Sequence, residues 1–218
     1  MNKVAGLLLA AGTSSRMGIP KQLLPLGGLT LLDLVLEQAL RSQLDLVALV
    51  LGFHSREIGQ ALSVDPRHPK LKVVLNERYL EGISSSIIAG LSAVEDDYDH
   101  AMVILGDMPY VTSGLINILL RRYLASGFPL GAVKLKTKRS HPVIISRLFY
   151  PDVHRLQGDE GARDLFARYA DRICWVESEK EDVDLDIDTA GDYLRLRETF
   201  GKEAADAPLP PGGRHRKN

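Results

Sequence analysis

The feature that most constrains the fold is a run of seven residues without a polar side chain, from Val4 to Ala10. Such a run is typical of a β-strand buried on both faces, as in parallel sheets that helices cover on both sides. It is too short for a membrane-spanning helix, which needs about 18 apolar residues. Because it leads into a Gly/Ser loop that carries Arg16 and Lys21, we interpret it as a first strand and not as a signal peptide.

Apolar runs of strand length then alternate with segments whose apolar residues have helical spacing. The predicted strands are 46–51, 71–75 and 101–105, and the predicted helices are 31–40, 55–62, 84–93 and one from Thr112 or Ser113 to about Gly127. This alternation predicts an α/β fold with three layers (αβα) and a mostly parallel mixed sheet of the Rossmann-like type. Ligands of such folds bind beyond the carboxyl ends of the strands, so the residues after each strand are the candidates for function.

The alternation loosens in the second half of the chain. We expect strands at 130–135 and 141–146 joined by a polar turn at 136–140, a helix at 161–169, short strands at 173–176 and 183–187, and a closing helix at 190–200. Residues 201–218 lack a core-forming pattern and end in a basic tip, which is either a contact site or simply solvated. The prediction is one domain over residues 1–200 and a disordered tail over residues 201–218.

Composition narrows the function classes. The 218 residues carry 27 Lys plus Arg against 28 Asp plus Glu, and the net charge of −1 argues against nucleic acid as a dominant partner. Cys174 is the single cysteine, which excludes an internal disulfide and a cysteine-rich metal site. No segment has the length and hydrophobicity of a membrane span, so we expect no membrane partner and a cytoplasmic protein.

The loop after the first strand has the composition of a phosphate-binding loop. Gly12 and Gly18 permit a tight turn with inward-facing backbone N–H groups, and the loop adds three hydroxyl groups and two positive charges, from Thr13, Ser14, Ser15, Arg16 and Lys21. The spacing is neither that of a P-loop nor that of G-x-G-x-x-G. The alternative is an ordinary connection with surface charges; we favour binding of a polyanion such as a triphosphate.

A carboxylate directly follows the fourth predicted strand, in the sequence Leu105-Gly106-Asp107-Met108-Pro109. Asp107 is well placed to hold Mg²⁺, which prefers one or two carboxylates together with substrate phosphates. We expect Gly106 to permit an unusual backbone angle there. The alternative role for Asp107 is to cap the next helix, but Pro109 and the later Thr112 make that less natural.

Other candidates follow later strands. Asn76 and the serines of Gly82–Ser86 either cap a helix, which is the simpler interpretation, or contact a base or ribose. His141 before Pro142 and the loop around Asp159 lie in the second half of the chain. Asp186 or Asp188 is a candidate second carboxylate for the metal.

The loop Leu9-Ala10-Ala11-Gly12-x-Ser14-Ser15-Arg16-Met17-Gly18-x-x-Lys21 resembles the signature of nucleotidyltransferases with the nucleotide-diphosphosugar transferase fold. Within these, the chain most resembles the molybdenum cofactor cytidylyltransferases and the related guanylyltransferases. Four later elements agree in order: Asn76 with Gly82–Ser86, Gly106–Pro109, His141–Val143 with Gly158–Arg163, and Asp186–Thr189. The resemblance covers roughly residues 3–200.

The resemblance implies Mg²⁺-dependent transfer of CMP from CTP to the terminal phosphate of molybdenum-loaded molybdopterin, with release of pyrophosphate. It implies catalytic roles for Arg16, Lys21 and Asp107, acceptor binding by His141, Asp159 and Arg163, and a metal held by Asp107 with Asp186 or Asp188. The nucleotide-binding residues that it implies are Leu9, Ala10, Ala11, Gly12, Ser14, Ser15, Arg16, Lys21, Asn76, Gly82, Ser84, Ser86 and Gly106. An apo-molybdoenzyme that receives the product is a further implied partner.

Alternatives remain open at this point. Ser140 replaces the glycine that usually precedes His-Pro-Val in the family, so the acceptor pocket is a place where this chain departs from the pattern. The same chemistry with GTP is the nearest competitor, and a sugar or alditol phosphate is an alternative acceptor for a cytidylyltransferase. A carrier or maturation factor that binds the cofactor without turnover is the non-enzymatic alternative.

Overall fold

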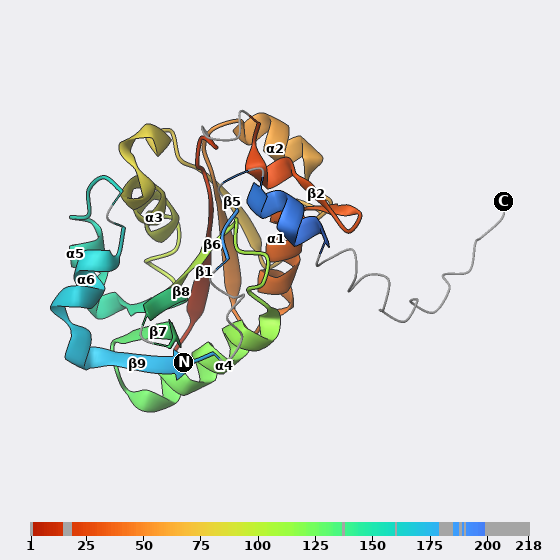
Figure 1. Ribbon diagram of the computed structural model, residues 1–218. Helices are drawn as coiled ribbons and strands as arrows, with labels where there is room; N and C mark the ends of the chain where they lie inside the picture. Colours follow the sequence, from red (N-terminus) through yellow and green to blue (C-terminus); the bar gives the residue numbers. More distant parts are fainter. Residues whose placement is uncertain are drawn as a thin grey trace.

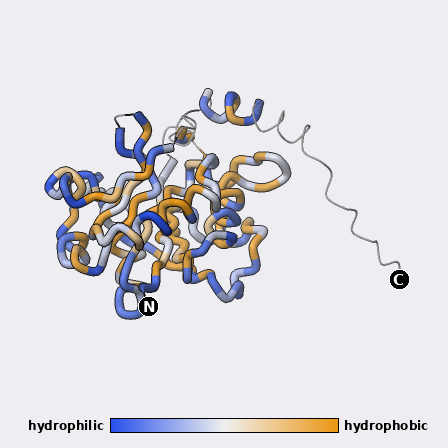
Figure 2. Tube along the Cα trace, turned by 90° about the horizontal axis from the view of Figure 1, so that it is seen from below, coloured by the Kyte–Doolittle hydropathy of each residue, from blue (hydrophilic) through white to orange (hydrophobic). Residues whose placement is uncertain are grey.

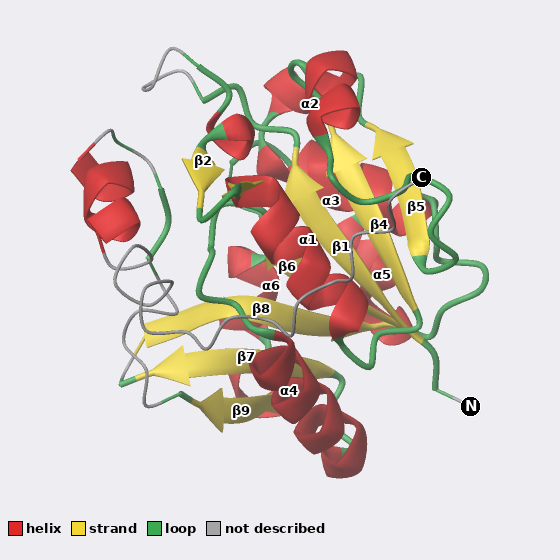
Figure 3. Cartoon of the chain, turned by 90° about the vertical axis from the view of Figure 1, so that its right-hand side faces the viewer, coloured by secondary structure: helices red, strands yellow, loops and turns green. Residues whose placement is uncertain are grey.

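The computed structural model describes residues 2–14, 19–136, 138–159, 161–178, 185–187, 189 and 191–198, and its centre is one seven-stranded sheet. The strand order is β5-β4-β1-β6-β8-β7-β9 (Figures 1 and 3). Parallel pairs join β5, β4, β1 and β6, while β8 runs antiparallel to both β6 and β7, and β9 is parallel to β7. The predicted mostly parallel mixed sheet is confirmed.

The elements have the following bounds. The strands are β1 Val4–Ala10, β2 Pro25–Leu26, β3 Leu29–Thr30, β4 Leu46–Leu51, β5 Leu71–Leu75, β6 His100–Leu105, β7 Leu130–Leu135, β8 Lys138–Ser146 and β9 Ile173–Glu177. The α-helices are α1 Leu31–Arg41, α2 Ser55–Ala61, α3 Ile83–Ser92, α4 Ser113–Ser126, α5 Tyr150–Val153 and α6 Arg163–Arg168. Short 3₁₀ helices are η1 Lys21–Leu23, η2 Tyr79–Glu81, η3 Arg147–Phe149 and η4 Ala170–Arg172, and residues 191–198 are helical.

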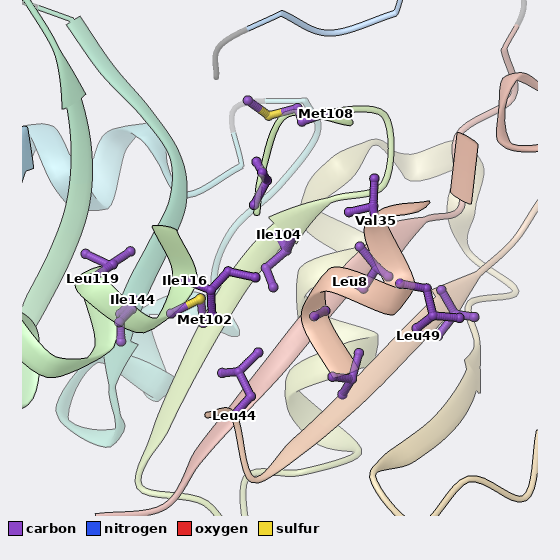
Figure 4. Close-up of a cluster of buried hydrophobic side chains, with 14 of the residues drawn as sticks. Leu8, Val35, Leu44, Leu49, Met102, Ile104, Met108, Ile116, Leu119 and Ile144 are labelled. Carbon is purple, nitrogen blue, oxygen red and sulfur yellow. The ribbon is translucent and has the colours of Figure 1, made fainter. Parts of the chain in front are cut away.

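Helices cover both faces of the sheet, because its central strands are apolar on both sides. Leu8 of β1 packs into a cluster with α1, α2 and α4, part of which Figure 4 shows. Leu7 and Leu9 point to the opposite face and pack with α3, α5 and α6. The three layers are visible in Figure 1, and the apolar segments run through the middle of the molecule in Figure 2. The predicted αβα architecture is therefore confirmed.

Local sequence signals fix the ends of the long helices. The hydroxyl of Thr30 accepts a hydrogen bond from the N–H of Asp33, whose carboxylate accepts one from the N–H of Thr30, so α1 begins with a capping box. Thr112 caps α4 in the same way through the N–H of Leu115, which decides between the two predicted caps. Gly127 ends α4 with a φ of 71°, a left-handed conformation that glycine adopts without strain.

The second half of the chain departs more from prediction. β8 begins at Lys138, so the expected polar turn is shorter, and the β7–β8 ladder changes register between Ala132 and Val133. The helix expected from Gly161 begins at Arg163, because Gly161 has a φ of 57°. Residues 185–187 form no strand, and residues 183, 184 and 201–218 lie outside the described part. No helix among the described residues is long and apolar enough to cross a membrane.

Candidate active site

A cavity of about 380 Å³ opens at the carboxyl ends of β1 and β6. Its walls come from the loop after β1, the loop after β6, the start of α3 and Asp159. The lining residues are Leu9, Ala10, Ala11, Gly12, Thr13, Lys21, Gln22, Tyr79, Leu80, Gly82, Ile83, Ser86, Leu105, Gly106, Asp107 and Asp159. Ligands of open α/β sheets bind in this position, where connections leave neighbouring strands in opposite directions.

The buried side chain of Gln22 braces the loop after β1. Its amide nitrogen donates to the carbonyl oxygens of Ala10, at 3.1 Å, and of Gly12, at 3.3 Å. The N–H of Phe53 donates to the carbonyl of Ala11 at 3.3 Å, so three successive carbonyls of this loop are bonded to protein groups. This arrangement fixes the backbone along one wall of the cavity.

The loop continues through Ser14, which has a φ of 52° and whose hydroxyl accepts a hydrogen bond of 3.0 Å from the N–H of Lys21. The bond holds the chain at the point where the cation at position 21 enters the cavity. Ser15 and Arg16, two of the predicted nucleotide-binding residues, lie outside the described residues.

A lysine and an aspartate from opposite walls meet inside the cavity. The ammonium group of Lys21 lies 2.5 Å from a carboxylate oxygen of Asp107, and their side chains are only 15% and 21% exposed. Coulomb attraction is stronger at a sheltered position than at the open surface. The Asp107 carboxylate supplies the hard oxygen that Mg²⁺ prefers, at the wall of a cavity large enough for phosphates, so the residue fits the predicted metal site.

Gly106 is required for a reason other than the predicted one. Its φ is not in the left-handed region, so the expectation of an unusual backbone angle was wrong. A Cβ at this position would lie 2.9 Å from the carbonyl oxygen of Leu9, to which the N–H of Gly106 donates at 2.9 Å. Glycine therefore lets the end of β6 pack closely on β1, which brings Asp107 beside the loop that carries Lys21.

The start of α3 is bound to a loop from the second half of the chain. The N–H of Ser84 donates to the carbonyl of Gly158 at 3.1 Å, and its hydroxyl donates to the carbonyl of Gln157 at 3.1 Å. Asp159 accepts a 3.3 Å hydrogen bond from the N–H of Ile83, and its side chain also lines the cavity. Gly82 has a φ of 89°, and a Cβ there would collide with the backbone of Gly158.

The remaining predicted nucleotide-binding residues of this region divide between two cavities. Ser86 and Gly82 line the first cavity, while Asn76 and Ser84 line a neighbouring cavity of about 370 Å³. Asn76 is buried, and its amide donates to the hydroxyls of Ser85, at 2.9 Å, and Ser86, at 3.1 Å. Through these bonds, Asn76 orients the Ser85 and Ser86 side chains at the start of α3.

The predicted acceptor and second metal residues are not among those that line the first cavity, apart from Asp159. His141 lies in β8 before a cis peptide bond to Pro142, and Arg163 is the first residue of α6. Asp186 lines a separate cavity of about 350 Å³ with Tyr110, although the N–H of the next residue donates to the carbonyl of Asp107 at 3.3 Å.

Asp188 lies outside the described residues. Among the residues that the structure describes, no three His, Cys, Asp or Glu side chains form a group that could hold a metal ion. A metal at Asp107 would therefore take most of its ligands from a bound substrate or from undescribed residues.

Sequence reasoning missed several residues that line the cavity. The sequence analysis assigned no role to Gln22, because nothing in the sequence indicates that its polar side chain is only 4% exposed. Tyr79 and Leu80 follow β5 in a 3₁₀ turn, and Tyr79 packs so closely on Gly52 that a Cβ there would lie 2.6 Å from the Cβ of Tyr79. Tyr79 and Leu80 could have been found by their position after a predicted strand.

Comparison with known proteins gives the class. Residues 6–173 match the model of the MobA-like NTP transferase domain, and the chain belongs to this family of nucleotidyltransferases. The family-level resemblance inferred from the motifs is thereby confirmed.

Individual relatives carry different names. The chain is 31% identical to the purine catabolism protein PucB of Bacillus subtilis, over 88% of this chain and 95% of that protein. It is 26% identical to the molybdenum cofactor cytidylyltransferase of Escherichia coli, over 92% and 98%, and 28% identical to the nicotine blue oxidoreductase of Paenarthrobacter nicotinovorans, over 88% and 96%.

Among solved structures, the fold is similar to the Mycobacterium sp. strain JC1 homologue of Mycobacterium tuberculosis Rv0371c. The TM-score is 0.81, with 31% identity over 92% of this chain and 98% of that one. A structure of Rv0371c from Mycobacterium tuberculosis H37Rv in complex with manganese has a TM-score of 0.77 and 27% identity, over 91% of this chain and 100% of that one.

Proposed function

We propose that this nucleotidyltransferase joins CMP from CTP to the terminal phosphate of molybdenum-loaded molybdopterin and releases pyrophosphate. The observation that carries the proposal is the pairing of Lys21 with Asp107 inside a cavity whose walls are the loops after β1 and β6. A cation that can bind phosphate and a carboxylate that can bind a divalent metal are the two charges that phosphoryl-type transfer requires.

The reaction is a displacement at phosphorus. An oxygen of the acceptor phosphate forms a bond to the α-phosphorus of CTP, and the bond from that phosphorus to the bridging oxygen of the β-phosphate breaks. Lys21 and Arg16 bind the triphosphate and stabilise the negative charge that develops on the leaving pyrophosphate. No covalent enzyme intermediate is needed, so the chain contributes position and charge.

Asp107 would hold the Mg²⁺ ion, with Asp186 or Asp188 as a second carboxylate. When bound, the ion would neutralise phosphate charge and polarise the phosphorus–oxygen bonds. A divalent metal is supported by the manganese complex of the Rv0371c relative. In the absence of substrate, the ammonium group of Lys21 neutralises the Asp107 carboxylate.

The wall formed by Ala11, Gly52 and Tyr79 supports the choice of CTP. Ala11 is 3% exposed, and a Cβ on Gly52 would lie 2.9 Å from its methyl group, so these residues are closely packed. We infer that this wall restricts the base site and favours a pyrimidine over the larger purine of GTP. The Phe53 ring packs against Tyr79, with the two ring centroids 6.0 Å apart.

The test measures pyrophosphate release with Mg²⁺ and each of the four ribonucleoside triphosphates, with and without molybdenum-loaded molybdopterin. Release that requires both CTP and the pterin is expected. Release with GTP instead would keep the chemistry and overturn the base assignment.

Two other outcomes would replace the proposed acceptor or activity. Release with CTP and a sugar or alditol phosphate alone would replace molybdopterin. Pterin binding without release from any triphosphate would favour the cofactor carrier, or a redox activity such as the name of the nicotine blue oxidoreductase relative indicates.

A further inference from the structure

Arg139, near the start of β8, has a half-buried guanidinium group with little to balance its charge. Its one hydrogen bond to the described residues is long, 3.4 Å to the carbonyl of Ala162, and the group lies 4.8 Å from the centre of the Phe166 ring. Among the described residues, no carboxylate lies within 4.0 Å of Arg139. A charge in this setting is costly unless an anion binds to it.

A second arginine increases this uncompensated charge. Arg163 directly follows Ala162, is exposed, and likewise has no carboxylate within 4.0 Å among the described residues. Burial lowers the pKa of Arg139 from its usual value, and the positive charge of Arg163 lowers it further. Two guanidinium groups that repel each other form a ready binding site for an oxyanion, because each presents several N–H donors in a fixed plane.

Arg147, at the other end of β8, shows what a structural arginine looks like in the same protein. Its guanidinium also lies over an aromatic ring, that of Tyr150, at 5.8 Å. However, it donates to the carbonyls of Asp96, at 3.3 Å, and Tyr98, at 3.0 Å, and lies 4.0 Å from the carboxylate of Asp99. Ring stacking alone therefore does not explain why Arg139 has one long hydrogen bond and no carboxylate within 4.0 Å among the described residues.

The strand register brings Arg139 to the active-site end of the sheet. Val103 of β6 pairs with Val143 of antiparallel β8. Along β7, Ala132 pairs with Val143 and Lys134 pairs with Arg139, so Arg139 lies two levels beyond Val143. This places it at about the level of Leu105, the last residue of β6, from which the chain leads to Asp107.

Residues 158, 159 and 161–163 connect the cavity with this arginine pair. Asp159 lines the nucleotide cavity, and a Cβ on Gly161 would lie 3.1 Å from the side chain of Ile83 at the start of α3. Three lysines precede Arg139 in the β7–β8 hairpin, at positions 134, 136 and 138, and the ammonium group of Lys134 lies 3.9 Å from the Glu177 carboxylate.

We propose that Arg139 and Arg163 bind an oxyanion group of the acceptor, of the phosphate monoester class, beside the nucleotide cavity. This inference rests on the proposed function in that it takes the bound molecule to be the acceptor. The nucleotide then occupies the parallel part of the sheet, and the acceptor enters over the start of β8 and α6.

The first experiment does not depend on turnover. The thermal unfolding of the full chain is followed with increasing inorganic phosphate, at ionic strength held constant with chloride. Phosphate should raise the Tm of the wild type and of the control Arg147→Gln, since a ligand that binds only the folded state stabilises it. The increase should be lost in Arg139→Gln and reduced in Arg163→Gln, whose exposed side chain can be removed without affecting packing.

The second experiment separates the two substrates in steady-state kinetics. Arg139→Gln should raise the KM for molybdenum-loaded molybdopterin about tenfold, equivalent to about 1.4 kcal/mol, and leave the KM for CTP within about twofold. Arg147→Gln should change neither KM.

The outcomes distinguish this inference from the proposed function. If phosphate stabilises the wild type but not Arg139→Gln, and molybdopterin gives no pyrophosphate, the anion site stands and the proposed acceptor is wrong. If molybdopterin turns over and Arg139→Gln changes neither its KM nor the effect of phosphate, the inference is overturned and the proposed function stands. A wild type that phosphate does not stabilise also overturns it.

Discussion

The two parts of the sheet place their functional side chains in different ways. In the parallel part, β5-β4-β1-β6, cavity residues lie in the connections that leave the carboxyl ends of strands, as Lys21 after β1 and Asp107 after β6 illustrate. In the part formed by β8, β7 and β9, the antiparallel strand, a register shift and the loop at 157–163 bring Arg139 and Asp159 into place. Strand ends therefore position the residues of the proposed nucleotide site, whereas contacts between distant segments position the residues of the proposed acceptor site.

The largest expected effect tests the parallel part directly. Asp107→Asn keeps the size of the side chain but removes its charge, so turnover should fall at least ~10²-fold, on the scale of losing one preorganised electrostatic group. Pyrophosphate release at saturating Mg²⁺ measures it. The control Asp65→Asn, which removes an exposed carboxylate paired with Arg67, should leave turnover unchanged. Wild-type turnover in Asp107→Asn would contradict the metal assignment.

Lys21→Met should separate metal binding from catalysis, because the ammonium group competes with a metal for Asp107. We expect turnover to fall about 10-fold to 100-fold from the loss of one charge-assisted contact to phosphate. In the absence of nucleotide, the same variant should bind Mn²⁺ more tightly than the wild type, which calorimetric titration measures. An unchanged or weaker Mn²⁺ affinity would mean that Lys21 does not compete with the metal for the Asp107 carboxylate.

Gly82→Ala should disturb the junction between the two parts, where α3 meets the loop at 157–159. The substitution combines a φ of 89° with a collision against the backbone of Gly158, so unfolding free energy should fall by about 1–3 kcal/mol. The KM for CTP should also rise, because Gly82 lines the cavity. Denaturant unfolding and steady-state kinetics measure the two effects.

The matched control is Gly59→Ala in α2, where a Cβ would meet nothing within 4 Å. Alanine is favoured over glycine in a helix, so this variant should be at least as stable as the wild type. Equal stability of the two alanine variants would show that the junction tolerates movement.

The smallest expected effect concerns the end of the sheet opposite the cavity, where His100 begins β6. One ring nitrogen of His100 contacts the Tyr123 hydroxyl at 2.9 Å, and the other is buried without a hydrogen-bond partner in the described structure. Burial lowers the pKa of His100, although Asp99 opposes this. The unfolded chain therefore takes up the proton first, so unfolding free energy should decrease slightly as pH falls below about 6.5.

The measurement is the urea midpoint of the wild type and of His100→Gln between neutral pH and mildly acidic pH. The wild type should lose more stability than the variant over this interval, while the KM for CTP is the same in both. If the urea midpoints of the two proteins changed with pH in parallel, another group would be responsible for the pH dependence. His154, which pairs with Glu95 at the surface, provides the control as His154→Gln.

Much of the parallel part could be predicted because its signals are local. The bounds of β1, β4 and β5 agree with the apolar runs, and Thr112 and Gly127 mark the ends of α4 as their side-chain chemistry predicts. Lys21 and Asp107 were found by a rule about strand ends and lie in one cavity. The reason assigned to Gly106 was wrong because close packing between strands leaves no local trace in the sequence.

The part of the chain proposed to bind the acceptor, from β7 to α6, was harder to predict from the sequence. The turn expected at 136–140 is polar in composition, yet its last residues pair with β7, so that Arg139 lies opposite Lys134 in the ladder. Likewise, the sequence predicts a helix from Gly161, although the left-handed φ of that residue delays α6 to Arg163. Polarity indicates exposure only on average, and strand pairing depends on partners elsewhere in the chain.

Local sequence patterns were sufficient to predict the αβα class, the order of strands and helices in the parallel part, and the charges that follow its strands. These features follow from the spacing of apolar residues along each segment, which is a local property of the sequence. Three other features became visible after folding: Gln22 braces the first loop, the N–H of Ile83 in α3 holds Asp159 at the cavity, and Arg139 lacks a carboxylate partner among the described residues. Each of these depends on contacts between segments far apart in the chain, where burial, packing distance and electrostatic balance arise only after folding.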